Sequence, residues 1–538
     1  EDGSQLRIQD DLKFSVDGTT FHSVLTSNST LDSTKLSPAI SAAPEITGTM
    51  TGSVSANGAI TVKSDGTLEA VTETTNVLNT PTKTTEHTIS VDENGNGMNS
   101  VSGFSLIHDL KNNKYVVGYG TYNNSHQYYR IGTPSTDGTT VTWGSRSSSQ
   151  GTGWEAYDVF WDTTSEKIVH IGKTNQNYWQ YRVQDGTTMS SLTNIDTSVN
   201  PSDSVCCQCG GKIVTYVKVG NYGYAKVGLV NSNNTITFGN TYTIANNVNS
   251  LRDICIAYDS THSRVVFGYT YYNGSNYVGM VRVGSISNYV LTLGSASYTV
   301  NSSTFVAAPS IVHNPSDEKM YFIFRDQTSG ISENGRLTGT VGTVADSGNS
   351  ISMSGSKTDA GSGNVQKSGI RTALTYNSEI NKVIAFWTLN SSNISYFGAV
   401  SSNNSNTFSF DTNFTNLIDR ETDPYTGPWM FKPVYNAANN ITIGVVPNDE
   451  DNKRLSFFAC DNGGKLSNSD KFIGFADAAY TNGQTATVKV VGNTTTQSSL
   501  TPGTTYYVQN NGTLGTTKQI HDVKAGIALS STKLLIKG

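Results

Sequence analysis

The chain has 538 residues, its formal net charge is -6, and only 14% of its residues are charged. That charged fraction is well below the ~25% of average globular proteins. The sequence contains no basic run, which argues against a nucleic-acid partner. No apolar run approaches the ~20 residues that a membrane-spanning helix requires, so we expect no membrane insertion.

The first 48 residues predict an N-terminal arm. Leu12–Val16 and Thr20–Leu25 are strand-like, and Asp17-Gly18 between them is typical of a two-residue hairpin turn. The stretch Ser27–Pro44 is rich in serine and threonine and predicts a linker. We expect this arm to attach the chain to another protein.

Residues 49–84 predict a separate small hairpin segment. Gly58–Lys63 and Thr67–Val71 are strand-like and flank another Asp-Gly turn, Asp65-Gly66.

A hairpin pattern then recurs along the chain. The pattern consists of an aromatic residue or histidine, then Asp or Asn, a few turn residues, usually Lys or Arg, and a run of β-branched residues. The third copy is shorter than the others. The seven copies begin at Ile107, Phe160, Cys207, Ile256, Val312, Thr375 and Val434. They recur roughly every 50–60 residues, a little above the ~40–50 residues of propeller repeats.

Each repeat has room for four strands. Tyr277–Val283 is an example of a third strand and Thr235–Phe238 of a fourth, and no useful helical periodicity is present. Four strands per repeat are typical of a propeller blade. The sequence therefore predicts an all-β chain with a seven-bladed β-propeller over residues 85–470.

The acidic residue of the repeated hairpin is expected to cap its turn. Asp109, Asp162 and Asp259 occupy this position, where Asp and Asn side chains bond the local backbone. A hydrolytic glycosidase needs two facing carboxylates outside such a turn, and the sequence reveals no such pair. His108 and His313 share a repeat position with Trp161 and tyrosines, which indicates packing rather than metal binding. We expect no catalytic residue and no cofactor.

Five cysteines are present, and three of them lie in one strand-like stretch. The odd count does not suit a disulfide framework. A zinc site at Cys207 and Cys209 would need a further ligand pair, to which Cys255 is a candidate contributor. We favour small apolar packing residues on an inner strand, with no metal, and leave open whether Cys206, Cys207 and Cys209 bind one.

Aromatic and amide side chains recur between the second and third strands of three repeats. Such loops suit carbohydrate, because rings stack on sugar faces while polar groups bond the hydroxyls. The alternative is that these rings pack between neighbouring repeats. The candidate glycan-binding residues are Tyr128, Tyr129, Tyr178, Trp179, Tyr181, Tyr271, Tyr272 and Tyr277.

Residues 471–538 predict a compact C-terminal β module, beginning with the alternating strand Thr485–Val491. The stretches Gly474–Tyr480, Leu500–Gly503 with Tyr506–Val508, and Ala528–Gly538 resemble the C-terminal module of fibre-like virion proteins. Those proteins come from tailed bacteriophages of marine bacteria and cyanobacteria. Asn57–Leu68 resembles a segment that precedes the repeats in the same proteins.

The resemblance covers most of residues 49–538 and implies a virion fibre or spike on the particle surface, an oligomer with a trimer favoured. Its expected partners are other virion proteins, through the N-terminal arm, and host-surface polysaccharide. Two alternatives remain: a capsid-surface decoration or head fibre without a receptor role, and a polysaccharide-degrading propeller enzyme. The non-enzymatic fibre is the preferred interpretation.

Overall fold

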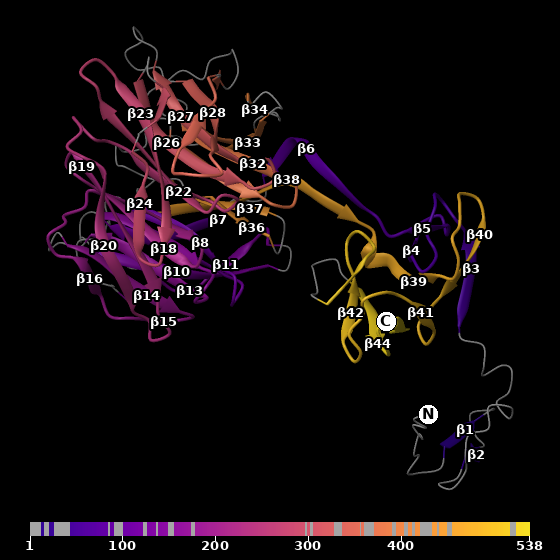
Figure 1. The fold of residues 1–538 in the computed structure, drawn as a ribbon. Helices are drawn as coiled ribbons and strands as arrows, with labels where there is room; N and C mark the ends of the chain where they lie inside the picture. Colours follow the sequence, from indigo (N-terminus) through magenta and orange to yellow (C-terminus); the bar gives the residue numbers. More distant parts are fainter. Residues whose placement is uncertain are drawn as a thin grey trace. The chain divides into compact units, whose positions relative to one another are not determined.

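The computed structural model describes residues 12–15, 21–25, 44–83, 87–90, 101–121, 126–135, 138–148, 155–173, 178–295, 298–301, 305–327, 336–355, 357–359, 371–389, 394–402, 407–410, 415–419, 433–437, 441–448, 454–516 and 523–537. Within these ranges the chain is made of strands, and its one helical element is a short 3-10 turn, η2 (Ser469–Lys471). The all-β prediction is confirmed (Figure 1). No helix in the described part is long and apolar enough to cross a membrane.

The chain divides into two compact units. Unit 1 combines residues 1–74 with residues 466–538, and unit 2 comprises residues 75–465. Residues 49–84 and 471–538 are predicted to form separate segments, whereas strands from both share one sheet of unit 1.

Among the described residues, unit 2 contains seven antiparallel sheets of four or five strands. Sheet 1 comprises β8 (Val101–Asp109), β9 (Lys114–Thr121), β10 (His126–Pro134) and β11 (Val141–Trp143). Sheet 2 comprises β12 (Glu155–Asp162), β13 (Lys167–Lys173), β14 (Trp179–Asp185), β15 (Thr188–Met189) and β16 (Thr193–Asp196). Sheet 3 comprises β17 (Asp203–Cys209), β18 (Lys212–Val219), β19 (Tyr222–Val230) and β20 (Ile236–Ala245).

The remaining sheets repeat this order. Sheet 4 comprises β21 (Ile254–Asp259), β22 (Arg264–Tyr272), β23 (Tyr277–Ser287), β24 (Val290–Leu293) and β25 (Tyr298–Asn301). Sheet 5 comprises β26 (Phe305–Asn314), β27 (Lys319–Gln327), β28 (Arg336–Val344), β29 (Ile351–Met353) and β30 (Thr358–Asp359). Sheet 6 comprises β31 (Arg371–Asn377), β32 (Lys382–Leu389), β33 (Ile394–Ser402), β34 (Phe408–Phe410) and β35 (Thr415–Asp419).

Sheet 7 combines strands from both ends of the unit. Its inner strands are β36 (Val434–Asn436), β37 (Ile441–Asn448) and β38 (Arg454–Ser467), and its outer strands are β6 (Glu73–Lys83) and β7 (His87–Ser90). Strands that precede sheet 1 in the sequence therefore complete the last sheet.

The first strands of the seven sheets form a closed ring. Contacts run from β8 to β12, β17, β21, β26, β31 and β36, and β36 contacts β8 again. Polar side chains bond these strands to one another: Asp158 accepts from the Ser105 hydroxyl of sheet 1 and from the Cys206 N–H of sheet 3. Ser310 likewise accepts from the N–H of Leu374 in the next sheet.

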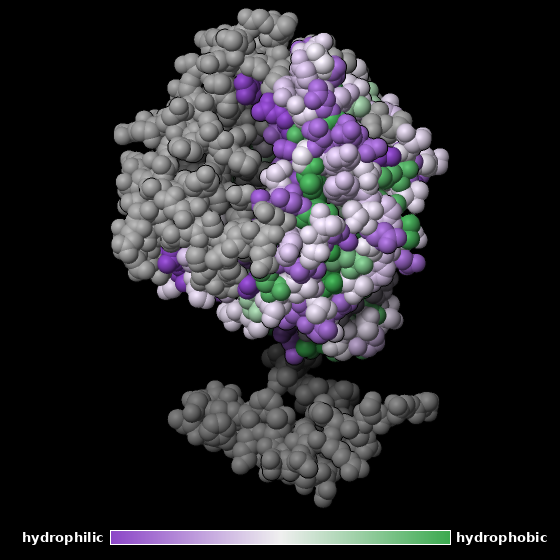
Figure 2. Space-filling view, turned by 90° about the vertical axis from the view of Figure 1, so that its left-hand side faces the viewer, coloured by the Kyte–Doolittle hydropathy of each residue, from purple (hydrophilic) through white to green (hydrophobic). Residues whose placement is uncertain are grey.

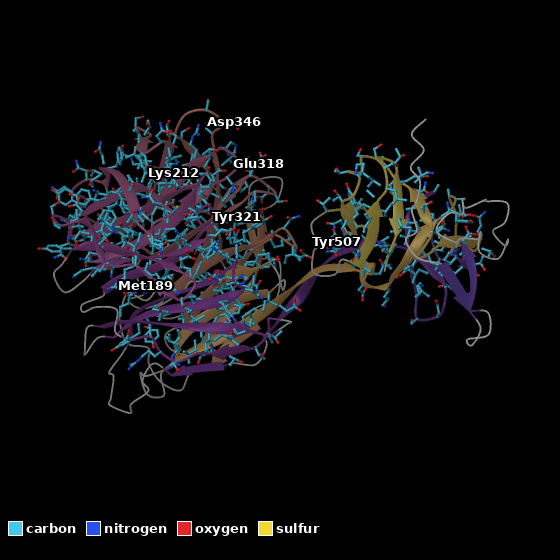
Figure 3. All side chains as sticks on the ribbon, turned by 90° about the horizontal axis from the view of Figure 1, so that it is seen from below. Met189, Lys212, Glu318, Tyr321, Asp346 and Tyr507 are labelled. Carbon is cyan, nitrogen blue, oxygen red and sulfur yellow. The ribbon has the colours of Figure 1, made fainter. Side chains whose placement is uncertain are left out.

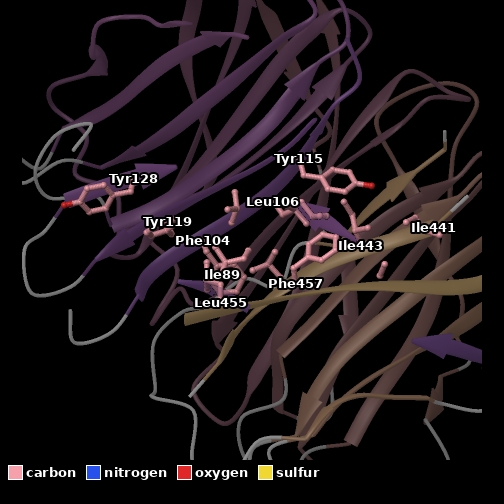
Figure 4. Close-up of a cluster of buried hydrophobic side chains, with 14 residues drawn as sticks. Ile89, Phe104, Leu106, Tyr115, Tyr119, Tyr128, Ile441, Ile443, Leu455 and Phe457 are labelled. Atoms are coloured by element: carbon pink, nitrogen blue, oxygen red, sulfur yellow. The ribbon is translucent and has the colours of Figure 1, made fainter. Parts of the chain in front are cut away.

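The hydrophobic core consists of clusters between neighbouring sheets. Where sheet 7 meets sheet 1, Ile443 and Phe457 pack against Leu106 and Tyr115, all buried (Figure 4). Similar clusters lie between sheets 3 and 4 and between sheets 5 and 6. The alternating strands bury apolar side chains on both faces because every sheet has two neighbours in the ring.

Unit 1 contains two further five-stranded sheets. One has the order β3 (Glu45–Thr49), β40 (Thr485–Lys489), β39 (Phe472–Ala476), β4 (Ala59–Val62) and β5 (Leu68–Ala70). The other has the order β41 (Thr494–Thr496), β45 (Lys533–Ile536), β44 (Val523–Ala528), β42 (Thr505–Val508) and β43 (Leu514–Gly515). The predicted N-terminal hairpin is present as β1 (Leu12–Ser15) paired with β2 (Phe21–Leu25).

Candidate functional site

The turns between the first and second strands of each sheet lie at one end of the ring, here called the first-turn end. In five of these turns an Asp or Asn accepts hydrogen bonds from N–H groups two or three residues later: Asp109 from Asn112, Asp162 from Ser165, Asp259 from Thr261, Asn314 from Ser316 and Asn377 from Glu379. The predicted capping role is confirmed in these five turns.

These turns also share a backbone conformation. The residue before the second strand has a positive φ in six sheets, at Asn113, Glu166, Gly211, Ser263, Glu318 and Asn381. Lys212 follows the first turn of sheet 3 and Glu318 belongs to that of sheet 5 (Figure 3). Because a left-handed residue is disfavoured for most side chains, the cap compensates for a strained turn.

In sheets 3, 4 and 5 the residue at the repeat position before the turn lies against the turn of the preceding sheet. His313 contacts Ser260, Gln208 donates to Asp162, and the Tyr258 hydroxyl lies near Gly210. His313 is buried at this repeat position and bonds the neighbouring turn, whereas His108 bonds Asn113 within its own turn.

Sheets 4 and 5 meet at the first-turn end in a network of histidines and carboxylates. Asp259 Oδ2 lies 2.7 Å from His262 Nδ1, and Asp259 Oδ1 lies 3.0 Å from His313 Nε2. The other ring nitrogen of His262 lies 3.1 Å from exposed Asp346. Burial lowers the pKa of His262, but the bonds and charges of Asp259 and Asp346 outweigh it and raise that pKa overall.

The cysteines pack in the interior. Cys206, Cys209 and Cys255 are buried, and the sulfur atoms of Cys207 and Cys209 lie 3.2 Å apart. Burial raises the pKa of the Cys209 thiol well above its ordinary value, which disfavours the thiolate that metals bind. Within the described residues no group of three or more His, Cys, Asp or Glu side chains is placed to hold a metal ion.

The opposite end of the ring, here called the second-turn end, carries the turns between second and third strands. The three predicted tyrosine-rich stretches belong to such turns, since Thr121 pairs with His126, Lys173 with Trp179, and Tyr272 with Tyr277. Residues 122–125 and 174–177 within them lie outside the described part of the chain.

Three of the eight predicted glycan-binding residues are core residues instead. Trp179 is 0% exposed and Tyr181 3%, and both pack in the cluster between sheets 2 and 3. Tyr128, 7% exposed, belongs to the cluster between sheets 1 and 7 and lies under the guanidinium of Arg146. This part of the prediction is wrong, because the neighbouring sheets already cover these rings.

The other five predicted residues are partly exposed. Tyr129 packs between sheets 1 and 2, with its ring 6.2 Å from that of His170, and Tyr178 precedes β14. Tyr271, Tyr272 and Tyr277 lie together at the turn of sheet 4.

Two partly exposed aromatic rings lie together at the turn of sheet 4. The centroids of Tyr272 and Tyr277 are 5.3 Å apart at an interplanar angle of 52°. The guanidinium of Arg252 lies 4.7 Å above the Tyr277 ring, and this cation–π contact fixes the ring's orientation. Asn273 accepts from the N–H groups of Ser275 and Asn276, which closes the turn.

The neighbouring turn of sheet 3 adds two tyrosines that sequence reasoning missed. Tyr222 and Tyr224 stack with a centroid distance of 5.8 Å and an interplanar angle of 3°. The sequence does contain a signal for this second pair of tyrosines, because Tyr222 follows a Gly-Asn turn just as Tyr277 follows an Asn-rich turn.

One connecting segment joins the two turns. Val248 N–H donates to the carbonyl of Asn221 in the turn of sheet 3, and Tyr272 N–H donates to the carbonyl of Asn249. The backbones of the two turns are therefore adjacent, with Tyr224 packed toward sheet 2 and Tyr271 packed against the cluster between sheets 3 and 4. We call Tyr222, Tyr224, Tyr271, Tyr272 and Tyr277 the tyrosine rim.

Carboxyl groups also gather at the second-turn end. Asp203 begins β17 and Asp253 immediately precedes β21, six residues before Cys209 and Asp259 respectively, so they occupy the same repeat position. Burial, with the nearby charge of Asp253, raises the pKa of Asp203 to about 7. Neither residue belongs to the repeated turn, and the two were not predicted as a pair from the sequence.

The surface of sheets 2–4 is predominantly polar. Strands β16, β19 and β20 lie on the side of the molecule that Figure 2 presents, where hydrophobic residues form small separated groups. A surface of this kind offers hydrogen-bonding groups and isolated rings rather than an apolar docking face.

No protein-family model and no curated protein sequence matches the chain. Among solved structures, an α-L-arabinanase of Penicillium chrysogenum complexed with arabinobiose is 11% identical with a TM-score of 0.40, over 71% of this chain and 99% of that one. AofleA from Arthrobotrys oligospora is 7% identical with a TM-score of 0.36, over 69% and 95% of the two chains. Likenesses this weak do not define a shared function.

Proposed function

We propose that this chain is a bacteriophage virion fibre or spike that adheres to host-surface glycans, and that unit 2 is a seven-bladed β-propeller. The ring of seven sheets, completed by strands from both ends of the unit, supports the propeller. The resemblance of residues 49–538 to fibre-like virion proteins supports the virion assignment.

The tyrosine rim is the observation that carries glycan adhesion. Its rings are partly exposed on two adjacent turns, where a sugar ring can stack on them. Asn221 and Asn273 beside the rings supply amide groups for sugar hydroxyls. Several weak contacts of this kind become firm attachment when an oligomer presents many copies.

Glycan binding is tested with the full chain. Wild-type protein applied to an array of bacterial polysaccharides should bind at least one, and Tyr272→Ala with Tyr277→Ala should reduce that binding at least tenfold. Tyr507→Ala is the matched control, because Tyr507 is a partly exposed tyrosine of unit 1 and should leave binding unchanged. An array on which the wild type binds nothing would contradict the adhesion proposal.

The virion assignment has its own test. Antibody against this chain should label purified particles in immunogold electron microscopy, at distal tail fibres for a receptor-binding role. Label over the head would instead support the capsid-decoration alternative, and unlabelled particles would contradict both.

A further inference from the structure

Two histidines flank one buried carboxylate where sheet 5 meets the first turn of sheet 4. Asp259 is 0% exposed, and its two carboxylate oxygens lie 2.7 Å from His262 Nδ1 and 3.0 Å from His313 Nε2. His262 belongs to the turn between β21 and β22, whereas His313 belongs to β26 of sheet 5. The carboxylate therefore links the two sheets through both rings.

The partners of the ring nitrogens give the two histidines different charges. His262 faces a carboxylate on both sides, since its Nε2 lies 3.1 Å from Asp346 Oδ1. Because a carboxylate only accepts hydrogen bonds, both nitrogens of His262 carry a proton and the ring is an imidazolium. His313 Nδ1 instead accepts from the backbone N–H of Ser260, so it carries no proton and the His313 ring is neutral.

The same turns in other sheets show that capping needs only one of the two bonds of His262. Asn112 in sheet 1 and Ser165 in sheet 2 also lie three residues after the capping Asp, and both donate to its carboxylate from neutral side chains. The second nitrogen of His262 is therefore not required by the turn. It reaches Asp346, in the turn between β28 and β29 of sheet 5.

Residues 346–349 of this β28–β29 turn, here called the hairpin tip, lie against sheet 4. Besides the contact with the imidazolium, Arg264 Nε donates to the Gly348 carbonyl and Asn349 Nδ2 donates to the Thr292 carbonyl. Guanidinium, amide and carbonyl groups do not titrate between about pH 5 and pH 9. The contact with the imidazolium is thus the one of these three that responds to pH in that range.

We propose that the hairpin tip is a pH-controlled latch between sheets 4 and 5, closed while His262 is charged and released when His262 loses its proton. A neutral imidazole donates only one hydrogen bond, so one of the two carboxylates then faces a bare ring nitrogen and is repelled. Asp346 is the carboxylate that separates, because it is exposed whereas Asp259 is buried between the sheets. This latch is independent of the proposed glycan adhesion.

The surrounding charges set the direction of the pH dependence. The charged and titratable groups packed around the two rings come from both sheets: Asp259, Arg264, His313, Asp317, Glu318 and Asp346. Burial acts to lower the pKa of His262, but the two carboxylates in contact with its ring raise that pKa overall. The stabilisation by the latch is therefore complete below about pH 6.5, the unfolded value, and is lost as pH rises through the folded value.

The test measures hydrogen exchange of the peptide that covers residues 345–350, in the full chain, at pH 6 and pH 9. After correction for the intrinsic rate, this peptide should exchange about two- to fivefold faster at pH 9, the size expected for a partly exposed ion pair. His262→Asn keeps a donor for Asp259, as Asn112 shows in sheet 1, and should exchange at the faster rate at both pH values. Asp346→Asn removes an exposed carboxylate without disturbing the core and should behave in the same way.

Two control variants make the result specific. His313→Gln should keep the pH dependence, because Gln208 at the same repeat position of sheet 3 donates to the preceding capping residue Asp162. Asp185→Asn, a partly exposed carboxylate of sheet 2, should also keep it. A wild-type rate that is independent of pH after correction, or a pH dependence that persists in Asp346→Asn, would overturn the latch. Loss of the pH dependence in His313→Gln would overturn it too, by assigning the titration to the other histidine.

Discussion

The side-chain amide of Asn436 donates a hydrogen bond to the hydroxyl of Tyr115, although 321 residues separate them. Asn436 ends β36 in sheet 7 and Tyr115 lies in β9 of sheet 1, and both are 0% exposed. Burial raises the pKa of Tyr115 to about 12, so it stays a neutral donor and acceptor at any physiological pH. This bond lies where the ring of sheets closes.

Tyr115→Phe should lower the free energy of unfolding by about 1–3 kcal/mol, because a buried polar group of Asn436 loses a partner. Urea unfolding measures the change. Tyr222→Phe, a partly exposed tyrosine of the same unit, is the control and should change stability little. Equal stability of wild type and Tyr115→Phe would show that this bond contributes nothing to ring closure.

Trp179→Ala should destabilise the chain by about 3–5 kcal/mol, since it leaves a cavity where a fully buried ring lay. Tyr272→Ala should cost far less, because that ring is partly exposed. Thermal melts of the two variants compare a core aromatic with a rim aromatic. A Trp179→Ala protein as stable as Tyr272→Ala would contradict the placement of Trp179 in the core.

Asn377→Ala should destabilise sheet 6 by about 1–3 kcal/mol. The Asn377 side chain accepts from the N–H groups of Glu379 and Ile380 in a turn that contains left-handed Asn381. Asn377→Asp keeps the accepting oxygen, as Asp109, Asp162 and Asp259 at the same repeat position show, and should recover most of the loss. Chemical denaturation of the three proteins checks this order.

Asp203→Asn should stabilise the protein at pH 8 more than at pH 5. Burial raises the folded-state pKa of Asp203 to about 7 from its ordinary value of 3.8, so wild-type stability falls as pH rises through this window. The neutral amide does not ionise and avoids that loss. A melting-temperature difference that is independent of pH would show that the Asp203 carboxyl is not perturbed.

His170 gives the opposite pH dependence. It is fully buried with its Nε2 2.8 Å from Gln184 Oε1, and burial lowers its pKa to about 4. The folded state therefore loses stability as pH falls from 6.5 toward 4, because only the unfolded chain accepts the proton readily. His170→Asn should lose less stability than wild type over this range, as measured by urea unfolding; identical pH profiles would contradict the assignment.

Much of this architecture was predictable from the sequence. The Asp or Asn of most first turns, the Lys or Arg that starts most second strands, and the roughly 50–60-residue spacing predicted repeated antiparallel hairpins. These signals are local, because a turn cap such as Asp259 bonds residues only two or three positions away.

The candidate site was only partly predictable. The tyrosine-rich stretches do lie at equivalent turns. However, successive side chains along a strand point to opposite faces, so that one ring packs in the core and the next lies toward solvent. Trp179 is thus buried whereas Tyr178 is partly exposed. Which face is covered depends on the neighbouring sheet, and that information is not local.

The sequence by itself therefore determined the strands, their capped turns and their repetition. Tertiary structure alone decided that β6 and β7 complete sheet 7, that residues 45–70 share a sheet with residues 472–489, and that Trp179 and Tyr181 lie in the core between sheets 2 and 3. The physical reason is range: caps and strand periodicity act over a few residues, whereas ring closure and the approach of charges depend on strands far apart in the chain.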